Sequence, residues 1–515
     1  MENTLPDRFN IVDLFHEAAR ENPDKQAIIY RERAVSFGEL ESAVNETAAH
    51  FLRKGIRKGD RVLVFVPMSI DLYRTVLALF RIGAVAVFLD EWVSVKRLAE
   101  SCRLAQCAAF IGTFKGRVLA RLLPGLRSIP LHLSLKYKSG RSVVAFPETG
   151  ADDIALITFT TGSTGIPKAA IRTHGLLFEQ FQALIPLIGP VGDPASNDIC
   201  MPVLPIVLLI NLGAGITSVI ADFDARKPDA MKPGKIAAQI SRYKVSSIIA
   251  SPFFVKQLSK YLQDNALVLN TIKKILTGGA PVFPSEAETY RNAFPHAHIG
   301  IVYGSTEAEP MSMIAVDELI ASETGKGLNV GKVERGATVK IIGIRDESIA
   351  VDDEEALSKL EVAPGGIGEI IVSGKHVLRD YLNNPDALKR NKIFVGNQCW
   401  HRTGDSGFWN GSLFLTGRCA SLIRTENGVL STFLFENRFQ TIKGVEMGTV
   451  MVVNDQLTAV IELGDPTQRE VVKSAIQSMI EAFAGIVFVQ KIPRDPRHNS
   501  KIDYEKLRVL LSHRK

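Results

Sequence analysis

In the sequence IALITFTTGSTGIPKAA, residues 154–170, an apolar run passes directly into a loop rich in glycine and hydroxyl side chains. The run from Ile154 to Phe159 predicts a short buried strand. The loop offers hydroxyls, accessible backbone N–H groups and one ammonium, a combination that forms an anion-binding concavity suited to a triphosphate. The residues in question are Thr160, Thr161, Gly162, Ser163, Thr164, Gly165 and Lys168.

Two other interpretations of this loop are a Walker A loop and a flexible surface loop. The Walker A pattern, G-x-x-x-x-G-K-[ST], cannot be laid on residues 160–168. A flexible surface loop remains an alternative when the stretch is taken alone. The choice between a phosphate-binding loop and a surface loop therefore depends on motifs elsewhere in the chain.

Composition indicates a globular enzyme of more than one domain. The chain has 515 residues, of which 46% are apolar and 23% charged, with a net charge of +6 and no run of five or six like charges. This pattern argues against a nucleic-acid-binding protein and is compatible with small anionic ligands. The five cysteines form no CxxC pair or zinc spacing, and the polar start at Met1 lacks an apolar signal core. We therefore expect reduced thiols and a cytoplasmic protein.

One segment has the length and apolar composition of a membrane span. Ile199–Ile220 contains no charged residue and is long enough to cross a bilayer. However, Pro202 and Pro205 interrupt it, and acidic Asp198 and Asp222 flank it instead of basic anchors. We expect a buried strand, loop and helix lining an apolar pocket, and no transmembrane span.

The order of apolar segments predicts an α/β protein. Strands over 61–66 and 84–89 enclose a helix over 68–82, which is a βαβ unit and indicates a parallel sheet. The alternation returns between residues 245 and 302, and strands are expected to dominate from 337 to 372. After Arg418 the pattern becomes that of a small α+β domain, with a helix over 433–442, strands over 445–453 and 457–463, and a last helix from Asp503.

Four further motifs and one lysine accompany the glycine-rich loop. They are Thr277-Gly278-Gly279-Ala280-Pro281, Tyr303-Gly304-Ser305-Thr306-Glu307-Ala308, Arg402-Thr403-Gly404-Asp405, Gly417-Arg418 and Lys501. In this order and rough spacing the chain resembles the adenylate-forming enzymes, which include acyl-CoA synthetases, peptide-synthetase adenylation domains and luciferases. The resemblance runs from about residue 10 to about residue 512.

This resemblance implies an architecture and a reaction. It implies a large N-terminal AMP-binding portion, residues 1–417, with layered sheets and helices, and a small mobile C-terminal domain, residues 418–515. A substrate carboxylate would attack the α-phosphorus of ATP in the cleft between them, giving an acyl-adenylate and pyrophosphate. The implied cofactors are ATP and Mg²⁺. The activated acyl group would then pass to CoA or a carrier protein, or close internally to a β-lactone.

The resemblance also assigns roles to residues that contact the nucleotide. Tyr303 offers an aromatic face to adenine, and the backbone of Gly278, Gly279 and Ala280 packs against the base. Asp405 accepts from both ribose hydroxyls, and Arg418 makes a second contact and marks the hinge. Gly304 and Ser305 complete the nucleotide-binding set.

The remaining assigned residues act on the phosphates. Thr306 donates to the α-phosphate, and the carboxylate of Glu307 suits Mg²⁺. Lys168 follows the β- and γ-phosphates as pyrophosphate leaves. Lys501 contacts the substrate carboxylate and the α-phosphate, where an ammonium stabilises developing charge.

Departures from the usual pattern point to one sub-branch. Cys419-Ala420 stands where relatives carry a charged hinge, and Leu434 replaces the first glutamate of a Glu-x-Glu pair that ends at Glu436. Ala109–Gly112, Tyr303–Pro310, Asn427-Gly428 and Arg497–Ile502 look like the β-lactone synthetases of bacterial olefin biosynthesis. The predicted substrate is a fatty or β-hydroxy acid. An ordinary acyl-CoA ligase, a nucleotide-binding pseudoenzyme and a membrane protein remain the alternatives.

Overall fold

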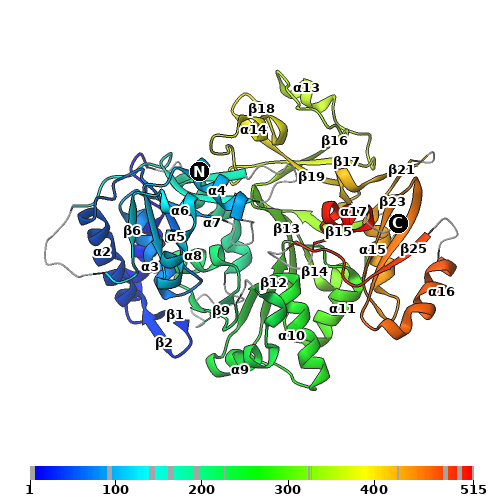
Figure 1. Ribbon diagram of the computed structural model, residues 1–515, viewed down its shortest axis with the longest axis horizontal. Helices are drawn as coiled ribbons and strands as arrows, with labels where there is room; N and C mark the ends of the chain where they lie inside the picture. The colour runs from blue at the N-terminus through cyan, green and yellow to red at the C-terminus, as the bar shows by residue number, and fades with distance from the viewer. Residues whose placement is uncertain are drawn as a thin grey trace.

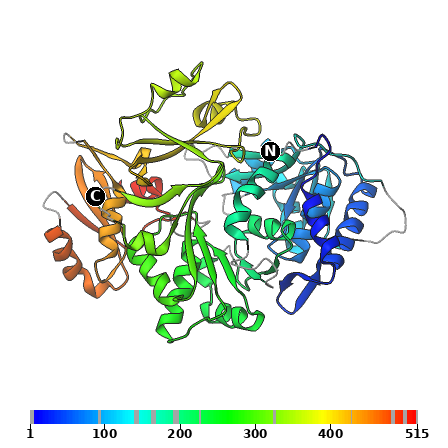
Figure 2. The same ribbon diagram turned by 180° about the vertical axis from the view of Figure 1, so that it is seen from behind.

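A computed structural model of the chain describes residues 6–89, 95–137, 145–160, 168–189, 198–224, 227–322, 325, 327–425, 428–479, 485–495 and 501–512. Figure 1 shows an N-terminal lobe, a central lobe, a smaller lobe that carries β16–β20, and a C-terminal domain beside the central lobe. Figure 2 shows the same arrangement from behind.

The N-terminal lobe is built on a six-stranded sheet in the order β6-β5-β3-β4-β7-β8. Its strands are β3 (Arg61–Phe65), β4 (Val85–Phe88), β5 (Ala109–Gly112), β6 (Leu131–Leu133), β7 (Ile154–Thr160) and β8 (Lys168–Thr173). Its helices are α1 (Val12–Glu21), α2 (Phe37–Arg53), α3 (Ile70–Arg81), α4 (Val95–Ala105), α5 (Phe114–Leu122), α6 (Pro124–Arg127) and α7 (His174–Ile188). All neighbours in the sheet are parallel except β7 and β8, which pair antiparallel.

A second sheet, of fourteen strands among the described residues, begins beside the N-terminal lobe and runs through the central lobe (Figure 1). Its strands are β1 (Gln26–Tyr30), β2 (Arg33–Ser36), β9 (Ile199–Pro202), β10 (Thr217–Val219), β11 (Ser247–Ala250), β12 (Lys274–Gly278), β13 (His298–Ser305), β14 (Ala308–Ala315) and β15 (Leu328–Val333). The helices connected to these strands are η1 (Pro228–Ala230), α9 (Pro233–Tyr243), α10 (Pro252–Asp264), α11 (Pro284–Ala293), α12 (Val316–Ile320) and α8 (Pro205–Gly213), of which α8 packs against α1 of the N-terminal lobe. Strands β9, β11, β12 and β13 run parallel, so their carboxyl ends meet at one edge.

The same sheet continues into the smaller lobe. This lobe contains β16 (Thr338–Ile342), α13 (Glu354–Ser358), β17 (Gly368–Ser373), α14 (Pro385–Asn391), β18 (Lys392–Val395), β19 (Gln398–Trp409) and β20 (Leu413–Arg418). Its strands pair antiparallel, with β17 beside β19 and β19 beside β20.

The C-terminal domain has its own core. It contains η2 (Cys419–Ser421), β21 (Ile423–Thr425), β22 (Gly428–Leu430), α15 (Thr432–Gln440), β23 (Val445–Val453), β24 (Gln456–Leu463), η3 (Pro466–Gln468), α16 (Arg469–Met479), β25 (Gly485–Val489) and α17 (Tyr504–Ser512). Phe439, Val472 and Ile476 are buried in one cluster between the sheet and its helices. This separate core agrees with a small α+β domain, while its boundary at residue 418 stays a prediction.

Most expected elements are present. Ser36 accepts from Glu39 N, and Glu39 accepts from Ser36 N, so the capping box forms at the start of α2. The uncharged segment 199–220 is β9, α8 and β10, and no described helix is both apolar and long enough to span a bilayer. Strands β16 and β17 lie between residues 337 and 373, as expected, and the short helix α13, which was not predicted, lies between them.

Candidate active site

The candidate site lies where parallel strands of the central lobe end. The chain leaves β13 at Ser305 and returns in β14 at Ala308, so Thr306 and Glu307 form the turn of a hairpin. Ligands of open α/β sheets bind outside the carboxyl ends of such strands. The position of this turn therefore brings both predicted residues to the edge where a ligand is expected.

Two glycines let the neighbouring strand approach closely. A Cβ atom on Gly278 would lie 2.3 Å from the carbonyl oxygen of Val302, and Gly279 has a φ of +88°. Neither position tolerates a larger residue without strain. The turn of the TGGAP motif is thereby held beside Tyr303, as a site for a flat base requires.

Asp405 is positioned by strand register. Its backbone pairs with Arg418 across β19 and β20, and Arg418 Nη1 lies 3.0 Å from Asp405 Oδ1. Tyr303 Oη donates to Asp405 Oδ2 at 2.9 Å. A carboxylate oxygen has two lone pairs, so both oxygens remain able to accept from a ribose hydroxyl.

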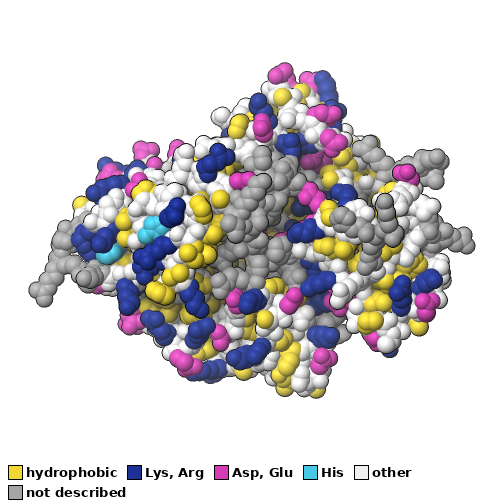
Figure 3. All heavy atoms as spheres, in the orientation of Figure 1, with side chains coloured by type: hydrophobic (Ala, Val, Ile, Leu, Met, Phe, Trp, Pro, Cys, Tyr) yellow, Lys and Arg dark blue, Asp and Glu magenta, His cyan; other side chains and the backbone are white. Residues whose placement is uncertain are grey.

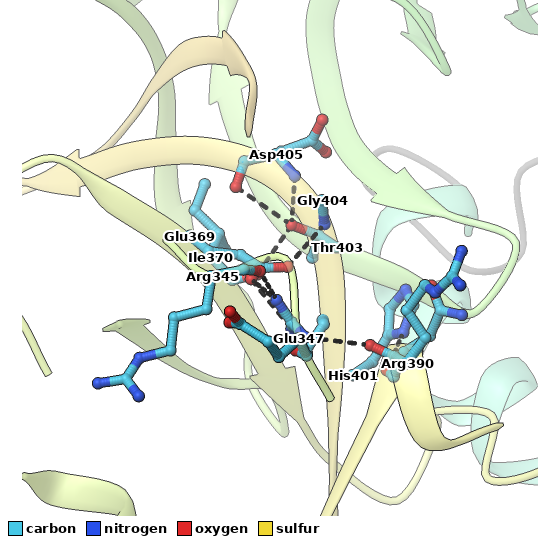
Figure 4. A network of polar contacts seen from close by, with 11 residues as sticks. Arg345, Glu347, Glu369, Ile370, Arg390, His401, Thr403, Gly404 and Asp405 are labelled. Atoms are coloured by element: carbon cyan, nitrogen blue, oxygen red, sulfur yellow. Dashed lines mark hydrogen bonds and ion pairs between the residues drawn. The ribbon is translucent and has the colours of Figure 1, made fainter. Parts of the chain in front are cut away.

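A buried network supports the strand that carries Asp405 (Figure 4). Arg402 Nη2 lies 2.7 Å from Glu369 Oε2, and the two side chains are only 6% and 5% exposed. Glu369 Oε1 accepts from Gly404 N at 3.3 Å, and Thr403 Oγ1 accepts from Asp405 N at 3.0 Å. Arg402 and Thr403 thus hold the backbone of this motif in place.

The glycine-rich loop is described only at its ends. Thr160 and Lys168 are opposite partners at the open end of the β7–β8 pair. Residues 161–167, which include Thr161, Gly162, Ser163, Thr164 and Gly165, lie outside the described residues, as does the side chain of Thr160. Lys168 Nζ donates to Asn391 Oδ1 at 3.0 Å.

Glu307 belongs to a buried cluster of charged residues. Tyr381 Oη donates to Glu307 Oε1 at 3.1 Å, and the ammonium groups of Lys168 and Lys392 lie 5.9 Å and 5.8 Å from the Tyr381 ring centre. Burial alone would raise the pKa of Glu307. Interactions with His401, Lys392 and Lys168 and the Tyr381 hydrogen bond outweigh that effect and lower the pKa of Glu307.

At neutral pH the ammonium groups of Lys168 and Lys392 are the positive charges that lower the pKa of Glu307. Burial lowers the pKa of His401 to about 3, so its ring is neutral there. Burial also lowers the pKa of Lys392, to about 8, and its ammonium donates to the carbonyl oxygen of Leu378. Glu307 is consequently an ionised carboxylate inside the protein, a form that a hard cation can bind.

Arg172 positions the turn and was not predicted from sequence. Its Nη2 donates to the carbonyl oxygen of Thr306 at 2.9 Å, and its Nη1 donates to Thr158 Oγ1 at 2.7 Å. Gln180 Oε1 accepts from its Nε at 3.2 Å. A charged residue inside the apolar strand β8 is the signal that could have identified it.

Lys501 lies where the backbone of residues 501–502 pairs with that of residues 494–495. Asp495 N donates to the carbonyl oxygen of Lys501 at 2.8 Å. The backbones of Arg494 and Ile502 form an isolated antiparallel β-bridge. Arg494 Nη2 in turn lies 3.0 Å from Glu462 Oε1, and both of these side chains are largely buried. Residues 496–500 of the predicted stretch lie outside the described residues.

A second buried carboxyl fixes the other side of Lys501. Glu436 Oε1 accepts from Tyr504 Oη and from Thr449 Oγ1, the latter at 3.0 Å. Burial raises the pKa of Glu436 to about 7, although both hydrogen bonds oppose it. Tyr504 starts α17 three positions after Lys501, so these contacts restrain the lysine.

One cavity brings residues of the separate motifs together. Its walls include Tyr303, Thr306, Glu307, Asp405 and Lys501. Lys501 lies close enough to Glu309 to oppose the rise in pKa that burial causes there. The cavity continues between α7 and α8, where apolar side chains line it: Phe181, Leu184, Leu204, Val207 and Ile210.

Comparison of the sequence with known proteins points to one family. The model of the family described as "AMP-binding enzyme" matches residues 15–382. An olefin beta-lactone synthetase of Stenotrophomonas maltophilia is 29% identical over 98% of both chains. A 4-coumarate–CoA ligase of Arabidopsis thaliana is 22% identical over 90% of this chain and 84% of its own.

Solved structures share the fold. The O-succinylbenzoate coenzyme A synthetase of Bacillus subtilis, solved in complex with AMP, has a TM-score of 0.78 at 19% identity, covering 98% of both chains. The coverage extends over the C-terminal domain as well as the lobes that form the cavity.

Proposed function

Because the chain belongs to the AMP-binding enzyme family, whose members form adenylates, we propose that it activates a fatty or β-hydroxy acid with ATP and then closes a β-lactone. The observation that carries the proposal is the single cavity in which Lys501, Thr306, Glu307 and Asp405 meet an apolar branch. The polar end suits a nucleotide and a carboxylate, and the apolar branch suits a hydrocarbon chain.

In the first step, the substrate carboxylate attacks the α-phosphorus of ATP and pyrophosphate leaves. Asp405 and Arg418 orient the ribose, and Tyr303 lies beside the base. Lys501 contacts the carboxylate and the α-phosphate, where its positive charge stabilises the transition state. Lys168 follows the departing phosphates.

Glu307 would hold Mg²⁺, which, when bound, neutralises charge on the phosphates. The fit rests on the ionised state of this buried carboxylate. No group of three or more His, Cys, Asp or Glu side chains in the described part of the chain could hold a metal ion by itself. This agrees with an ion that takes most of its ligands from phosphates and water.

In the second step, the β-hydroxyl oxygen of the adenylate attacks the acyl carbon. The bond from that carbon to the phosphate oxygen breaks, releasing AMP and a proton and leaving a four-membered lactone. Well-oriented intramolecular reactions gain effective molarities of roughly 10⁵ M or more. The apolar branch between α7 and α8 would orient the chain for this closure.

The runner-up function is an ordinary acyl-CoA ligase, which the similarity to a 4-coumarate–CoA ligase supports. In it, the thiol of CoA, or of an acyl carrier protein, would take the acyl group. The departure at Ala420 favours the lactone, because an alanine cannot exchange charge partners between two domain orientations as a charged hinge residue can. The free cysteines of the chain suit a reducing compartment, and we propose a cytoplasmic location.

The test is mass spectrometry of products from a 3-hydroxy fatty acid and its 3-deoxy analogue, each with ATP and Mg²⁺, with and without CoA. We expect the hydroxy acid to turn over without thiol and the deoxy acid to stop mainly at the adenylate. Efficient acyl-CoA formation from the deoxy acid, with no lactone from the hydroxy acid, would identify an ordinary ligase. Absence of pyrophosphate release from every acid would instead identify a pseudoenzyme.

A further inference from the structure

Helix α5 presents its large apolar side chains to solvent. Phe114 is 74% exposed, Leu122 73%, Val118 43% and Leu119 37%. Phe114, Val118 and Leu122 are each four residues apart, so they lie along one face of the helix. A surface helix normally turns such a face toward the core.

The opposite face of α5 explains why the large apolar side chains point to solvent. Gly116 and Ala120 are buried, and a Cβ atom on Gly116 would lie 2.9 Å from a ring carbon of Phe65. The helix therefore rests on the sheet through its smallest residues. Its large apolar residues are left outside, where they form a contiguous exposed patch of the kind that marks a binding surface.

The stretch of sequence around α5 concentrates positive charge. Residues 101–147 contain eight Lys and Arg residues and no Asp or Glu, whereas the whole chain has a net charge of only +6. Three of the eight, Lys115, Arg117 and Arg121, are on α5, and Arg127 ends α6. In Figure 3, hydrophobic side chains lie next to Lys and Arg side chains over the lobe where Figure 1 shows α5 and α6.

We propose that α5 and α6 form a docking surface for an anionic lipid bilayer. A bilayer surface supplies acyl chains for Phe114 and Leu122 and negative head groups for the flanking cations, which are the two attractions that interfacial helices use. An acidic protein would match the charges alone, and a neutral apolar partner would match the patch alone. This proposal does not depend on the substrate or on the second step proposed above.

The test is co-sedimentation of the full-length protein with vesicles of phosphatidylcholine alone or mixed with phosphatidylglycerol. We expect binding to the mixed vesicles that weakens as salt is added. The variant Lys115→Glu/Arg121→Glu should lower binding to them by at least about ten-fold, because each basic residue near an anionic surface contributes. The variant Phe114→Ser/Leu122→Ser should lower binding by a similar factor.

A matched control uses two exposed valines of the C-terminal domain. Val452 and Val471 are 52% and 65% exposed, and Val452→Ser/Val471→Ser should bind vesicles as the wild type does. Thermal unfolding and pyrophosphate release show whether each variant is folded. Failure of the wild type to bind either vesicle, or equal binding by the α5 variants and the control, would overturn the proposal. If the wild type binds neither vesicle but binds an isolated acidic protein, and the α5 variants do not bind that protein, the patch is a protein interface.

Discussion

Asp405 enters the cavity with both carboxylate oxygens already in contact, one with Tyr303 and the other with Arg418. We expect Asp405→Ala to weaken ATP binding by on the order of 1.5–3 kcal/mol, because two ribose hydroxyls lose a charged acceptor. Calorimetric titration with ATP measures this change. The exposed Asp352→Ala is the control, and unchanged affinity in Asp405→Ala would remove the ribose role.

Lys392 offers a second test at the level of single residues. It contacts Tyr381 and lowers the pKa of Glu307, and it is not among the residues predicted to contact the nucleotide. Replacing it with methionine keeps most of the volume and removes the cation. A neighbouring opposite charge lowers the pKa of a carboxyl group, so we expect the pKa of Glu307 to rise in Lys392→Met and its side chain to bind Mg²⁺ less well. The rate of adenylate formation should then require more Mg²⁺.

The matched variants for this test are Lys392→Arg, which keeps the charge, and Lys389→Met, which removes an exposed lysine nearby. The first should recover most of the magnesium response, and the second should leave it unchanged. A lower rate with an unaltered response to Mg²⁺ would mean that Lys392 only packs the core.

The sequence motifs predict residues of the candidate site but not the residues that support them. Asp405, Glu307 and Lys501 were predicted from the stretches around them, and the structure places all three at the wall of one cavity. Arg172 and Lys392 lie on separate strands, and no sequence pattern near either residue predicts its partners. Their contacts depend on how β8 and β18 are placed in space, which no local pattern encodes.

At the scale of elements, apolar periodicity was sufficient for most helices and strands. The strand predicted over 61–66 is β3, and the last helix, predicted from Asp503, begins one residue later at Tyr504. Periodicity could not give the pairing of Asp405 with Arg418, because register depends on long-range contacts. It also missed α13, whose five residues are too few for a helical pattern to stand out.

The contact of Glu436 with Tyr504 predicts a pH effect on the elements around Lys501. Burial raises the pKa of Glu436 from 4.5 to about 7. The folded state therefore keeps a proton that the unfolded chain releases, and this stabilisation is complete below about pH 4.5 and is lost as the pH rises through about 7. The shift corresponds to on the order of 3 kcal/mol.

Glu436→Gln stays neutral and should lose this dependence while keeping an acceptor for Tyr504 and Thr449. Hydrogen exchange of α15 and α17 at about pH 5 and about pH 8 measures it, since the difference between the two proteins cancels the intrinsic effect of pH. Wild type should lose more protection than the variant on going to the higher pH. Equal losses would show that Glu436 is charged in the folded protein across this range.

At the scale of the whole molecule, the position of the C-terminal domain places Lys501 in the cavity. Phe433 of α15 packs edge-on against Phe283 beside α11, with ring centres 5.8 Å apart. Two exposed ion pairs also cross this boundary, Lys256 with Glu446 at 3.4 Å and Lys491 with Asp229 at 3.2 Å. A small packed contact flanked by exposed charges is typical of a boundary that can open.

The Lys491–Asp229 pair allows this orientation to be tested. Its two side chains are 54% and 66% exposed, so the pair itself contributes no more than about 1 kcal/mol. Lys491→Asp would place two carboxylates in contact, disfavouring the orientation that delivers Lys501. We expect adenylate formation to fall by about two- to five-fold at low ionic strength, and added salt to relieve the loss by screening.

The reciprocal exchange separates orientation from a direct effect of Lys491 on the site. Lys491→Asp/Asp229→Lys restores an opposite pair with its polarity reversed, and it should recover most of the wild-type rate. Lys473→Asp, which changes an exposed lysine elsewhere in the domain, should leave the rate unchanged at every salt concentration. If the exchanged pair is as slow as Lys491→Asp alone, Lys491 acts on the cavity itself, and the ion pair does not set the domain orientation.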